Sequence, residues 1–210
     1  MRTNSENIAI YDFDGTLISF NSFKYWLLYS FILSLFFFRI DYNWLILKAT
    51  VQRMFGKTDR IVFKEKIMNF HEQNKIFARY CNASFASLLK KKTKSNLLDK
   101  RKKMFLATGA PDCYVKYYVL KMKCFENYSA SYIENGILKE NIGEKKLQTV
   151  TQLIDNKIHD AILFTDSSED IPLAQQVSQV FLICPANKTK KEYESAKISF
   201  LICSKTKIFY

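Results

Sequence analysis

The sequence YDFDGTLIS, residues 11–19, places Asp12 and Asp14 directly behind an apolar run. Aspartate is among the poorest strand formers, so two of them at this point suggest that a strand is ending. The overlapping stretch NIAIYDF, residues 7–13, is apolar and rich in strand formers, which predicts a short buried strand. This strand would deliver Asp12 to its carboxyl end.

The same pattern, an apolar run that ends in polar residues, recurs twice. In KKMFLATGAP, residues 102–111, the run stops at Thr108, and we expect a helix to begin near Asp112. In DAILFTDSSEDIPLAQQV, residues 160–177, the run stops at Thr165 and Asp166, and QVFLIC, residues 179–184, predicts a further strand. Strands that alternate with helices predict an α/β fold with a parallel sheet, whose polar strand ends meet at one edge.

The chain between the first two predicted strands has a different composition. Residues 25–38 carry no charge over 14 positions, and only Arg39 and Asp41 are charged among the 23 residues 25–47. Helix-period segments continue to about residue 99. We therefore expect a catalytic core made from residues 1–18 and 100–210, with an inserted all-helical cap over residues 19–99.

The overall composition limits the possible binding partners and the cellular compartment of the protein. The 210 residues carry a net charge of +12, which favours anionic partners, but the basic runs at 90–103 and 187–197 contain no nucleic-acid module, so no nucleic-acid partner is expected. Five scattered cysteines without a CxxC pair indicate reduced thiols in a cytoplasmic protein. The polar start MRTNSENIAI predicts no secretory signal peptide. The oligomeric state leaves no signature in the sequence.

The polar residues at the predicted strand ends indicate which reaction the site could catalyse. Asp12, Asp14, Asp166 and Asp170 would bring four carboxylates together, and such a cluster requires a cation. Oxygen ligands of this kind suit Mg²⁺ bound together with a substrate phosphate. Asp12 could then attack phosphorus while Asp14 supplies and later removes a proton, and Thr108 could bind the phosphoryl oxygens. A lysine is still needed to balance the charge of the transferring group.

These residues carry a resemblance to a known family. DFDGT, LATGAP, a lysine in GEKKL and TDSSEDIPL resemble, in order, the four motifs of the haloacid dehalogenase-like (HAD) phosphohydrolases, over residues 8 to about 185. A calcium-loop interpretation of the first motif fails because Gly15 at loop position six would place Ile10 and Asn21 at the ligand ends. The resemblance implies a Rossmann-like core, a cap, and a phosphatase mechanism that depends on Mg²⁺.

The roles of individual residues follow from the resemblance. It implies that Asp12 is the phosphorylated nucleophile and Asp14 the acid/base, and that Asp12, Asp166 and the main-chain oxygen of Asp14 bind Mg²⁺. The implied phosphate-binding residues are Asp12, Thr108, Gly109 and Lys146. Asp170 and Ser167 are expected to support the site.

Two details of these motifs need a choice. Lys146 is preferred over Lys145 as the lysine of the third motif, because Gly143-x-x-Lys146-Leu147 opens a helix in the family register; a solvated lysine pair is the alternative. Thr165 stands where many members of the family have glycine, but serine also occurs there in relatives.

His71 and His159 have no metal-ligand partner at helical spacing, and Cys113 is expected to fill the core.

The cap should select the substrate. The stretch after the first motif, Phe20-Asn21-Ser22, lacks the acidic residue that phosphoserine phosphatases have there, and SFNSFKYWLLYSF, TGAP, TDSSEDIPL and CPANK resemble the phosphatidylglycerophosphate phosphatases of type C. We therefore expect a membrane phospholipid monoester as substrate, at the inner face of the cell membrane. The alternatives are a phosphatase of a soluble phosphosugar, nucleotide or phosphoserine-like metabolite, and a non-catalytic basic binding module.

The apolar segment 25–47 leaves two interpretations open. A membrane span needs about 20 apolar residues, so 14 uncharged ones are too few to cross a bilayer. The segment is expected either to dip into one leaflet of an anionic membrane, with Trp26 and Trp44 near the interface, or to pack inside the cap.

Overall fold

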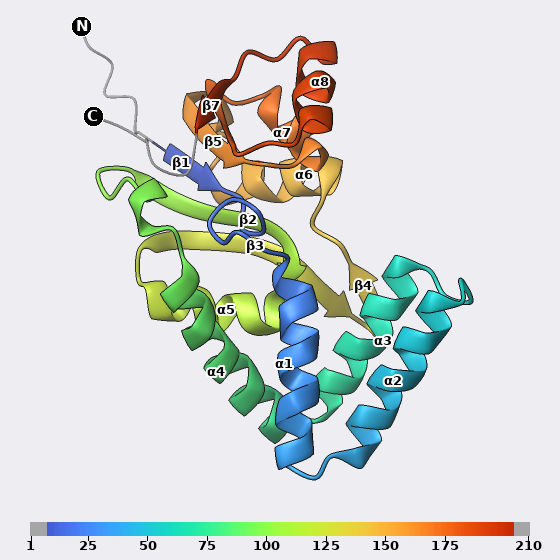
Figure 1. Cartoon of the computed structure of the whole chain (residues 1–210). Coiled ribbons are helices and arrows are strands. Elements are labelled where there is room, and N and C mark those ends of the chain that lie inside the picture. The colour runs from blue at the N-terminus through green and yellow to red at the C-terminus, as the bar shows by residue number, and fades with distance from the viewer. Residues whose placement is uncertain (1–7, 204–210) are drawn as a thin grey trace, which may run out of the picture.

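The chain folds around one seven-stranded sheet with the strand order β4-β3-β2-β1-β5-β6-β7 (Figure 1). The structure is a computed structural model and describes residues 8–203. All neighbouring strands are parallel except β4, which is antiparallel to β3. The strands are β1 (Ile8–Tyr11), β2 (Lys103–Pro111), β3 (Phe125–Glu134), β4 (Ile137–Lys139), β5 (Ala161–Thr165), β6 (Gln179–Ile183) and β7 (Leu201–Cys203).

Successive residues of the central strands point to opposite faces of the sheet and pack into two separate cores. In β1, Ala9 and Tyr11 belong to one apolar cluster, whereas Ile8 and Ile10 belong to the other. The period of two is that of a strand buried on both faces, which explains why each central strand is apolar along its whole length.

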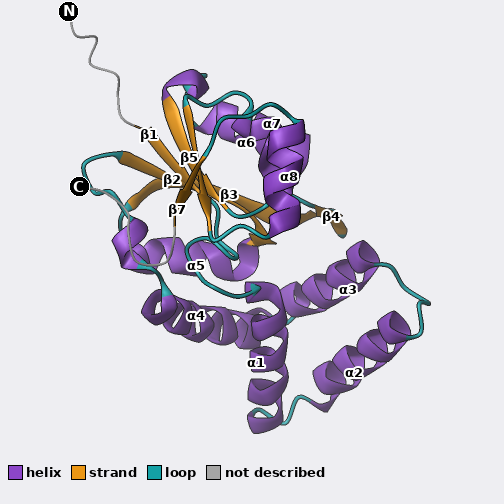
Figure 2. Cartoon of the chain, turned by 45° about the horizontal axis from the view of Figure 1, so that its top comes forward, coloured by secondary structure: helices purple, strands orange, loops and turns teal. Residues whose placement is uncertain are grey.

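Helices cover both faces of the sheet. Figure 2 shows α6, α7 and α8 on one side of the sheet, and α5 with α4 on the other. These helices are α4 (Lys75–Lys92), α5 (Asp112–Met122), α6 (Gly143–Leu153), α7 (Ile171–Ala174) and α8 (Asn187–Ser195). The arrangement is a layered α/β fold of the doubly wound kind.

Four helices lie between β1 and β2 in the chain. Besides α4 they are α1 (Ser22–Phe36), α2 (Ile40–Met54) and α3 (Arg60–Gln73). Figure 1 shows α1, α2 and α3 projecting from the sheet, while α4 runs beside α5. Asn21 caps α1 by accepting a hydrogen bond from the backbone N–H of Lys24 at 3.0 Å, and Asp59 caps α3 by accepting one from Val62 at 2.8 Å.

Helix α1 buries three serines together with Trp26, which was expected near a membrane interface, and exposes several large apolar side chains. Its buried face consists of Ser22, Trp26, Ser30 and Ser34, whereas large apolar side chains are exposed along the opposite face. The exposed residues are Tyr25, Leu28, Ile32, Leu35 and Phe36. Helix α2 also exposes large apolar side chains, namely Ile40, Trp44, Leu47, Val51 and Met54. We call these ten residues the outer apolar face.

Much of the expected architecture is found. The α/β class, the parallel sheet, the helical region after the first strand and the helix from Asp112 are confirmed. The first strand was expected over 7–13 but ends at Tyr11, and Asn7 lies outside the described residues. The strand expected over 179–184 ends at Ile183, because Cys184 adopts a left-handed backbone conformation with φ of 47°. Strands β3, β4 and β7 were not anticipated. The division into core and cap stays a prediction, and we use "cap" only as a name for helices α1–α4 and "core" only as a name for the rest of the described chain.

The remaining expectations concern single residues and the apolar segment. All five cysteines are free thiols. His71 is buried in the cap, with its Nε2 3.1 Å from Oδ1 of Asn82, whereas His159 is exposed. Within residues 8–203, no helix is both long enough and apolar enough to cross a membrane.

Candidate active site

The predicted site residues meet at the carboxyl edge of the sheet because β1 lies between β2 and β5. Tyr11 is in register with Leu106 of β2 and with Phe164 of β5. The residues that follow these positions, Asp12, Thr108 and Asp166, are therefore neighbours. The chain order of the strands reverses at this point, and open parallel sheets bind their ligands at such a switch point.

Asp12 forms a buried ion triad with a lysine and a second aspartate. Nζ of Lys146 donates to Oδ1 of Asp12 at 2.8 Å and to Oδ1 of Asp170 at 2.7 Å. The other carboxylate oxygen of Asp170 accepts a hydrogen bond from the hydroxyl of Thr165 at 2.6 Å. Asp12 thus has one oxygen held by Lys146, and Asp170 positions that lysine.

Asp14 and Asp166 approach Asp12 from the loop after β1 and from the end of β5. Oδ1 of Asp14 accepts a hydrogen bond from the backbone N–H of Ser22 at 2.9 Å, which ties it to the start of α1. Oδ1 of Asp166 accepts one from the hydroxyl of Thr16 at 3.2 Å. A Cβ atom on Gly15, whose φ is +79°, would lie 1.9 Å from Oδ2 of Asp166. Glycine is therefore required both for the backbone conformation and for the room that the Asp166 carboxylate occupies.

Thr108 and Gly109 form the opposite wall of the site. Oγ1 of Thr108 accepts a hydrogen bond from the backbone N–H of Ala110 at 3.0 Å, which leaves the hydroxyl proton available to another acceptor. The carbonyl oxygen of Gly109 accepts hydrogen bonds from Nζ of Lys64 and Oγ of Ser131, both at 2.8 Å. This end of β2 is thus held from the cap as well as from β3.

Burial makes the carboxylates of the site hard to ionise on their own. It raises the pKa of Asp12, against the opposing effect of Lys146, and it raises the pKa of Asp14 to about 6. It also raises the pKa of Asp166. Burial alone would lower the pKa of Lys146, but the carboxylates of Asp12 and Asp170 raise it, so this lysine stays charged.

The donor set fits one divalent cation that keeps several water ligands. Within residues 8–203, no three side chains of Asp, Glu, His or Cys are close enough to form a metal site by themselves. Two carboxylates, from Asp12 and Asp166, and the main-chain oxygen of Asp14 are a suitable set for Mg²⁺, which commonly binds through one or two carboxylates and water. The raised pKa values of these aspartates fit a site that is balanced by a cation.

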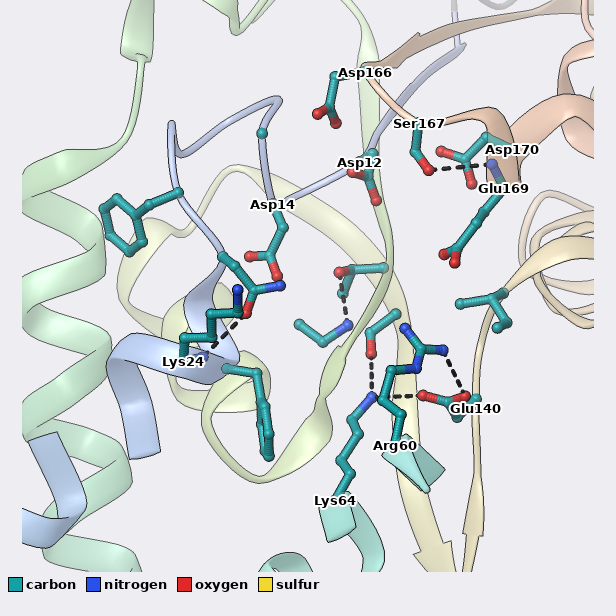
Figure 3. A pocket seen from close by; sticks show the side chains of 18 of the residues that line it. Asp12, Asp14, Lys24, Arg60, Lys64, Glu140, Asp166, Ser167, Glu169 and Asp170 are labelled. Atoms are coloured by element: carbon teal, nitrogen blue, oxygen red, sulfur yellow. Dashed lines mark hydrogen bonds and ion pairs between the residues drawn. The ribbon is translucent and has the colours of Figure 1, made fainter. Parts of the chain in front are cut away.

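These residues line a cavity of about 720 Å³ between the sheet and the cap. Figure 3 shows the aspartates on the sheet side and Lys24, Arg60 and Lys64 on the cap side. Glu140, which follows β4, joins the two sides because it accepts from Arg60 at 3.0 Å and from Lys64 at 3.1 Å.

The cavity contains the predicted residues and several that the sequence did not reveal. Every residue proposed for catalysis, phosphate binding, metal binding or support lines it: Asp12, Asp14, Thr108, Gly109, Lys146, Asp166, Ser167 and Asp170. Lys145 is exposed and does not line it. Lys24, Arg53, Arg60, Lys64 and Glu140 were missed, because a lysine or arginine on a helix gives no sign of whether it faces solvent or a cavity.

Three solved structures show the same fold over most of this chain. A protein of unknown function from Bordetella pertussis Tohama I is similar with a TM-score of 0.58 and 12% identity, over 93% of this chain and 98% of that one. A probable phosphoserine phosphatase from Vibrio cholerae has a TM-score of 0.55 and 12% identity, over 89% of this chain and 58% of that one. The chain thus shares the fold of these structures, a mostly parallel α/β sheet with a helical region after the first strand.

The third structure is a phospho-aspartyl intermediate analogue of phosphoserine phosphatase. It is similar with a TM-score of 0.50 and 13% identity, over 95% of this chain and 93% of that one. No family model matches the sequence, and no curated protein matches it. The similarity therefore describes the fold, and the chemistry must be argued from the site.

Proposed function

We propose that the protein is a Mg²⁺-dependent phosphatase that hydrolyses a phosphomonoester through a phospho-aspartate on Asp12. The observation that carries the proposal is the Asp12–Lys146–Asp170 triad, with Asp14 and Thr108 in the same cavity. A nucleophile, a candidate proton donor and a hydroxyl for the phosphoryl oxygens are then all available to one phosphoryl group. The phosphoserine phosphatases of similar fold make this reaction class a natural one for the site.

The reaction proceeds in two displacements at phosphorus. A carboxylate oxygen of Asp12 attacks phosphorus, the bond to the substrate oxygen breaks, and Asp14 gives its proton to that oxygen. Asp14 then takes a proton from water, the water oxygen attacks phosphorus, and inorganic phosphate leaves as the Asp12 carboxylate is restored. The pKa of Asp14, raised to about 6, suits a group that must both give and take a proton near neutral pH.

The remaining residues of the site stabilise the negative charge of the phosphoryl group and position Lys146. Lys146 and the hydroxyl of Thr108 stabilise the negative phosphoryl oxygens, and Asp170 keeps Lys146 directed at Asp12. Asp12, Asp166 and the main-chain oxygen of Asp14 would hold Mg²⁺, which, when bound, screens the aspartates from the incoming phosphate.

We further propose that the substrate is a phospholipid monoester, such as phosphatidylglycerophosphate, at an anionic membrane surface. All ten residues of the outer apolar face are at least 42% exposed, and exposed apolar side chains in such number support a contact with lipid. Of the eight lysines and arginines in residues 20–66, four line the cavity, and the other four are Arg39, Lys48, Lys57 and Lys66. An apolar surface on a segment that also exposes lysines suits a bilayer that contains anionic lipids.

The basic run 187–197 cannot take part in this contact. It forms α8, which Figures 1 and 2 both show on the far side of the sheet from α1 and α2. The charges next to the outer apolar face come instead from the cap, among them the exposed Lys48 and Lys57.

The main alternative is a phosphatase of a soluble metabolite. The phosphoserine phosphatases of similar fold favour it. The residues at the start of α1 favour the lipid, because Phe20, Asn21 and Phe23 line the cavity where an acidic residue would be needed to read an amino group.

A phosphate-release screen decides between these substrates. The purified protein is offered phosphatidylglycerophosphate in mixed micelles, phosphoserine, sugar phosphates and nucleoside monophosphates, each with Mg²⁺ or with EDTA. We expect Mg²⁺-dependent release that is fastest on the lipid. Faster turnover of a soluble phosphate would favour the alternative, and equal release in EDTA would refute the metal-dependent mechanism.

A further inference from the structure

The cavity is divided into an acidic end and a basic end. At the sheet, Asp12, Asp14, Asp166 and Asp170 outnumber Lys146. At the cap, the cavity is lined by Lys24 of α1, Arg53 of α2, and Arg60 and Lys64 of α3, and the two other acids that line it are Glu140 and Glu169. The aspartates are balanced by the proposed metal, but two carboxylates, one of which is shared by Arg60 and Lys64, cannot balance four cations.

Two of the four cations are already engaged. Lys64 and Arg60 share the carboxylate of Glu140, and Lys64 also donates to the carbonyl oxygen of Gly109. Lys64 is buried, so these contacts compensate its charge inside the protein. This pair connects α3 to Gly109 of β2, and we assign it to holding the cap on the core.

Lys24 and Arg53 are different. Among the described residues neither has a carboxylate within 4.0 Å, and Arg53 makes one hydrogen bond, from Nη1 to the carbonyl oxygen of Thr58 at 3.0 Å. Both side chains line the cavity and keep donors free for a ligand.

Lys24 and Arg53 are exposed, but the cavity that they line also has apolar walls. Phe20, Phe23, Leu27 and Phe63 line the same cavity. Apolar walls lower the local dielectric and strengthen an attraction between opposite charges. A cavity of about 720 Å³ also has room for a group beyond the phosphoryl group at Asp12.

We propose that Lys24 and Arg53 form a second anion subsite, which binds a negatively charged group of the substrate other than the phosphoryl group that is removed. The proposal rests on the proposed phosphatase function and narrows its substrate to phosphomonoesters that carry a further anion, such as a phosphodiester. Lys24 and Arg53 thereby become specificity-determining residues.

The test compares two water-soluble substrates, so that membrane contact plays no part. Glycerol 3-phosphate has a monoester and no other charge, whereas glycerophosphoglycerol phosphate, the deacylated head group, has the same monoester and a phosphodiester. We expect the wild type to prefer the second, and we expect Lys24→Met combined with Arg53→Met to reduce the ratio of the two kcat/KM values by about tenfold, mainly through KM.

The matched control is Lys48→Met combined with Lys57→Met, which removes two exposed cap lysines that do not line the cavity. We expect this control to keep the wild-type ratio. An equal loss on both substrates in the Lys24 and Arg53 variant would mean that these cations serve the transferred phosphoryl group or the fold, and would overturn the subsite. A wild type that hydrolyses both substrates equally well would overturn it too, while the phosphatase function would stand.

A binding measurement separates failure of the subsite from failure of the proposed function. Glycerophosphoglycerol has the diester but no monoester, so calorimetric titration of it does not depend on turnover. Binding that weakens about tenfold in the Lys24 and Arg53 variant, and not in the control, supports the subsite even if no phosphate is released. Absence of binding to the wild type contradicts it.

Discussion

The sheet of the core and helix α1 of the cap bury different kinds of side chain. In the sheet, β1 buries Ile8, Ala9, Ile10 and Tyr11 and presents its first charged group, Asp12, only at its end. Helix α1 buries three serines together with Trp26 and exposes five large apolar residues. The buried face of α1 is thus mainly polar, whereas β1 is apolar on both faces.

The buried serines of α1 are tolerated because each has a partner. The hydroxyl of Ser30 donates to the carbonyl oxygen of Leu27 at 2.9 Å and accepts from the hydroxyl of Tyr42 at 3.0 Å. Ser34 donates to the carbonyl oxygen of Phe31 at 2.7 Å and lies 2.5 Å from Oδ1 of Asn43. Hydrogen-bonded hydroxyls can be buried at little net cost, and small serines let α1 and α2 approach closely. The comparison teaches that the cap packs partly through hydrogen-bonded hydroxyl groups, while several of its large apolar side chains stay exposed.

The largest expected effect comes from a substitution that removes catalysis in the core and does not change the cap. Asp12→Asn removes the nucleophile but keeps the shape of the side chain, so turnover should fall by roughly 10⁴-fold. Phosphate release measures the loss, and sedimentation with anionic liposomes should stay at the wild-type level. Near wild-type turnover of this variant would contradict a covalent role for Asp12.

The next prediction compares the two histidines. Burial lowers the pKa of His71 to about 4, so this side chain stays neutral in the folded protein at a pH where the unfolded chain binds a proton. Above about pH 6.5 the lowered pKa of His71 should not change the free energy of unfolding. As the pH falls to 4, this lowered pKa should reduce the free energy of unfolding by about 3 kcal/mol. Denaturant melts at pH 7 and pH 4.5 should show a smaller pH-dependent loss for His71→Gln than for the wild type. His159→Gln, at an exposed position, should keep the wild-type loss, and equal losses in all three proteins would exclude His71 as the cause.

Gly15 tests how tightly the loop of the core fits Asp166. Gly15→Ala places a methyl group where the Asp166 carboxylate lies, so kcat/KM should fall by about 10²-fold. Gly136→Ala is the matched control, because Gly136 has a φ of +80° and open space around its Cβ position. Both variants strain the backbone, but only the first should lose activity. Equal activities would show that the close approach of Gly15 to Asp166 is unimportant.

The outer apolar face can be removed without disturbing the interior. Phe36, Ile40 and Trp44 are 76%, 77% and 66% exposed, so changing all three to Ser should leave the fold intact. Binding to anionic liposomes should fall by at least about tenfold, while activity on a soluble phosphate should persist. Leu120→Ser, at an exposed position of α5, should bind liposomes like the wild type. Unchanged sedimentation of the triple variant, or no sedimentation of the wild type at low salt, would exclude the membrane contact.

The smallest expected effect is a difference in the free energy of unfolding between substitutions on the two faces of α1. Ser30→Ala deprives the hydroxyl of Tyr42 of its acceptor and should lower the free energy of unfolding by about 1 kcal/mol. Ile32→Ser, on the exposed face of the same helix, should change it by less than about 0.5 kcal/mol. Thermal melts of both variants measure the difference. A larger cost for Ile32→Ser would mean that the outer apolar face is packed within the protein.

The pattern of apolar runs and polar strand ends in the sequence was enough to predict the strands that carry the site. β1, β2, β5 and β6 are buried on both faces, so each gives an uninterrupted apolar run. Strand β3 escaped prediction because its residues FENYSASYIE are partly exposed and polar, and β4 and β7 are too short, at three residues each, to show a period.

The sequence by itself determined the acidic end of the cavity, because the carboxyl ends of parallel strands always meet at one edge. Asp12, Thr108 and Asp166 could therefore be placed together from their positions in three separate motifs. Only the tertiary structure decided which face of α1 points outward, and that Lys24, Arg53 and Lys64 line the same cavity. A helix that is apolar on most of its circumference has no period that marks its buried face, and the direction of a helical cation depends on the tilt of one helix against another.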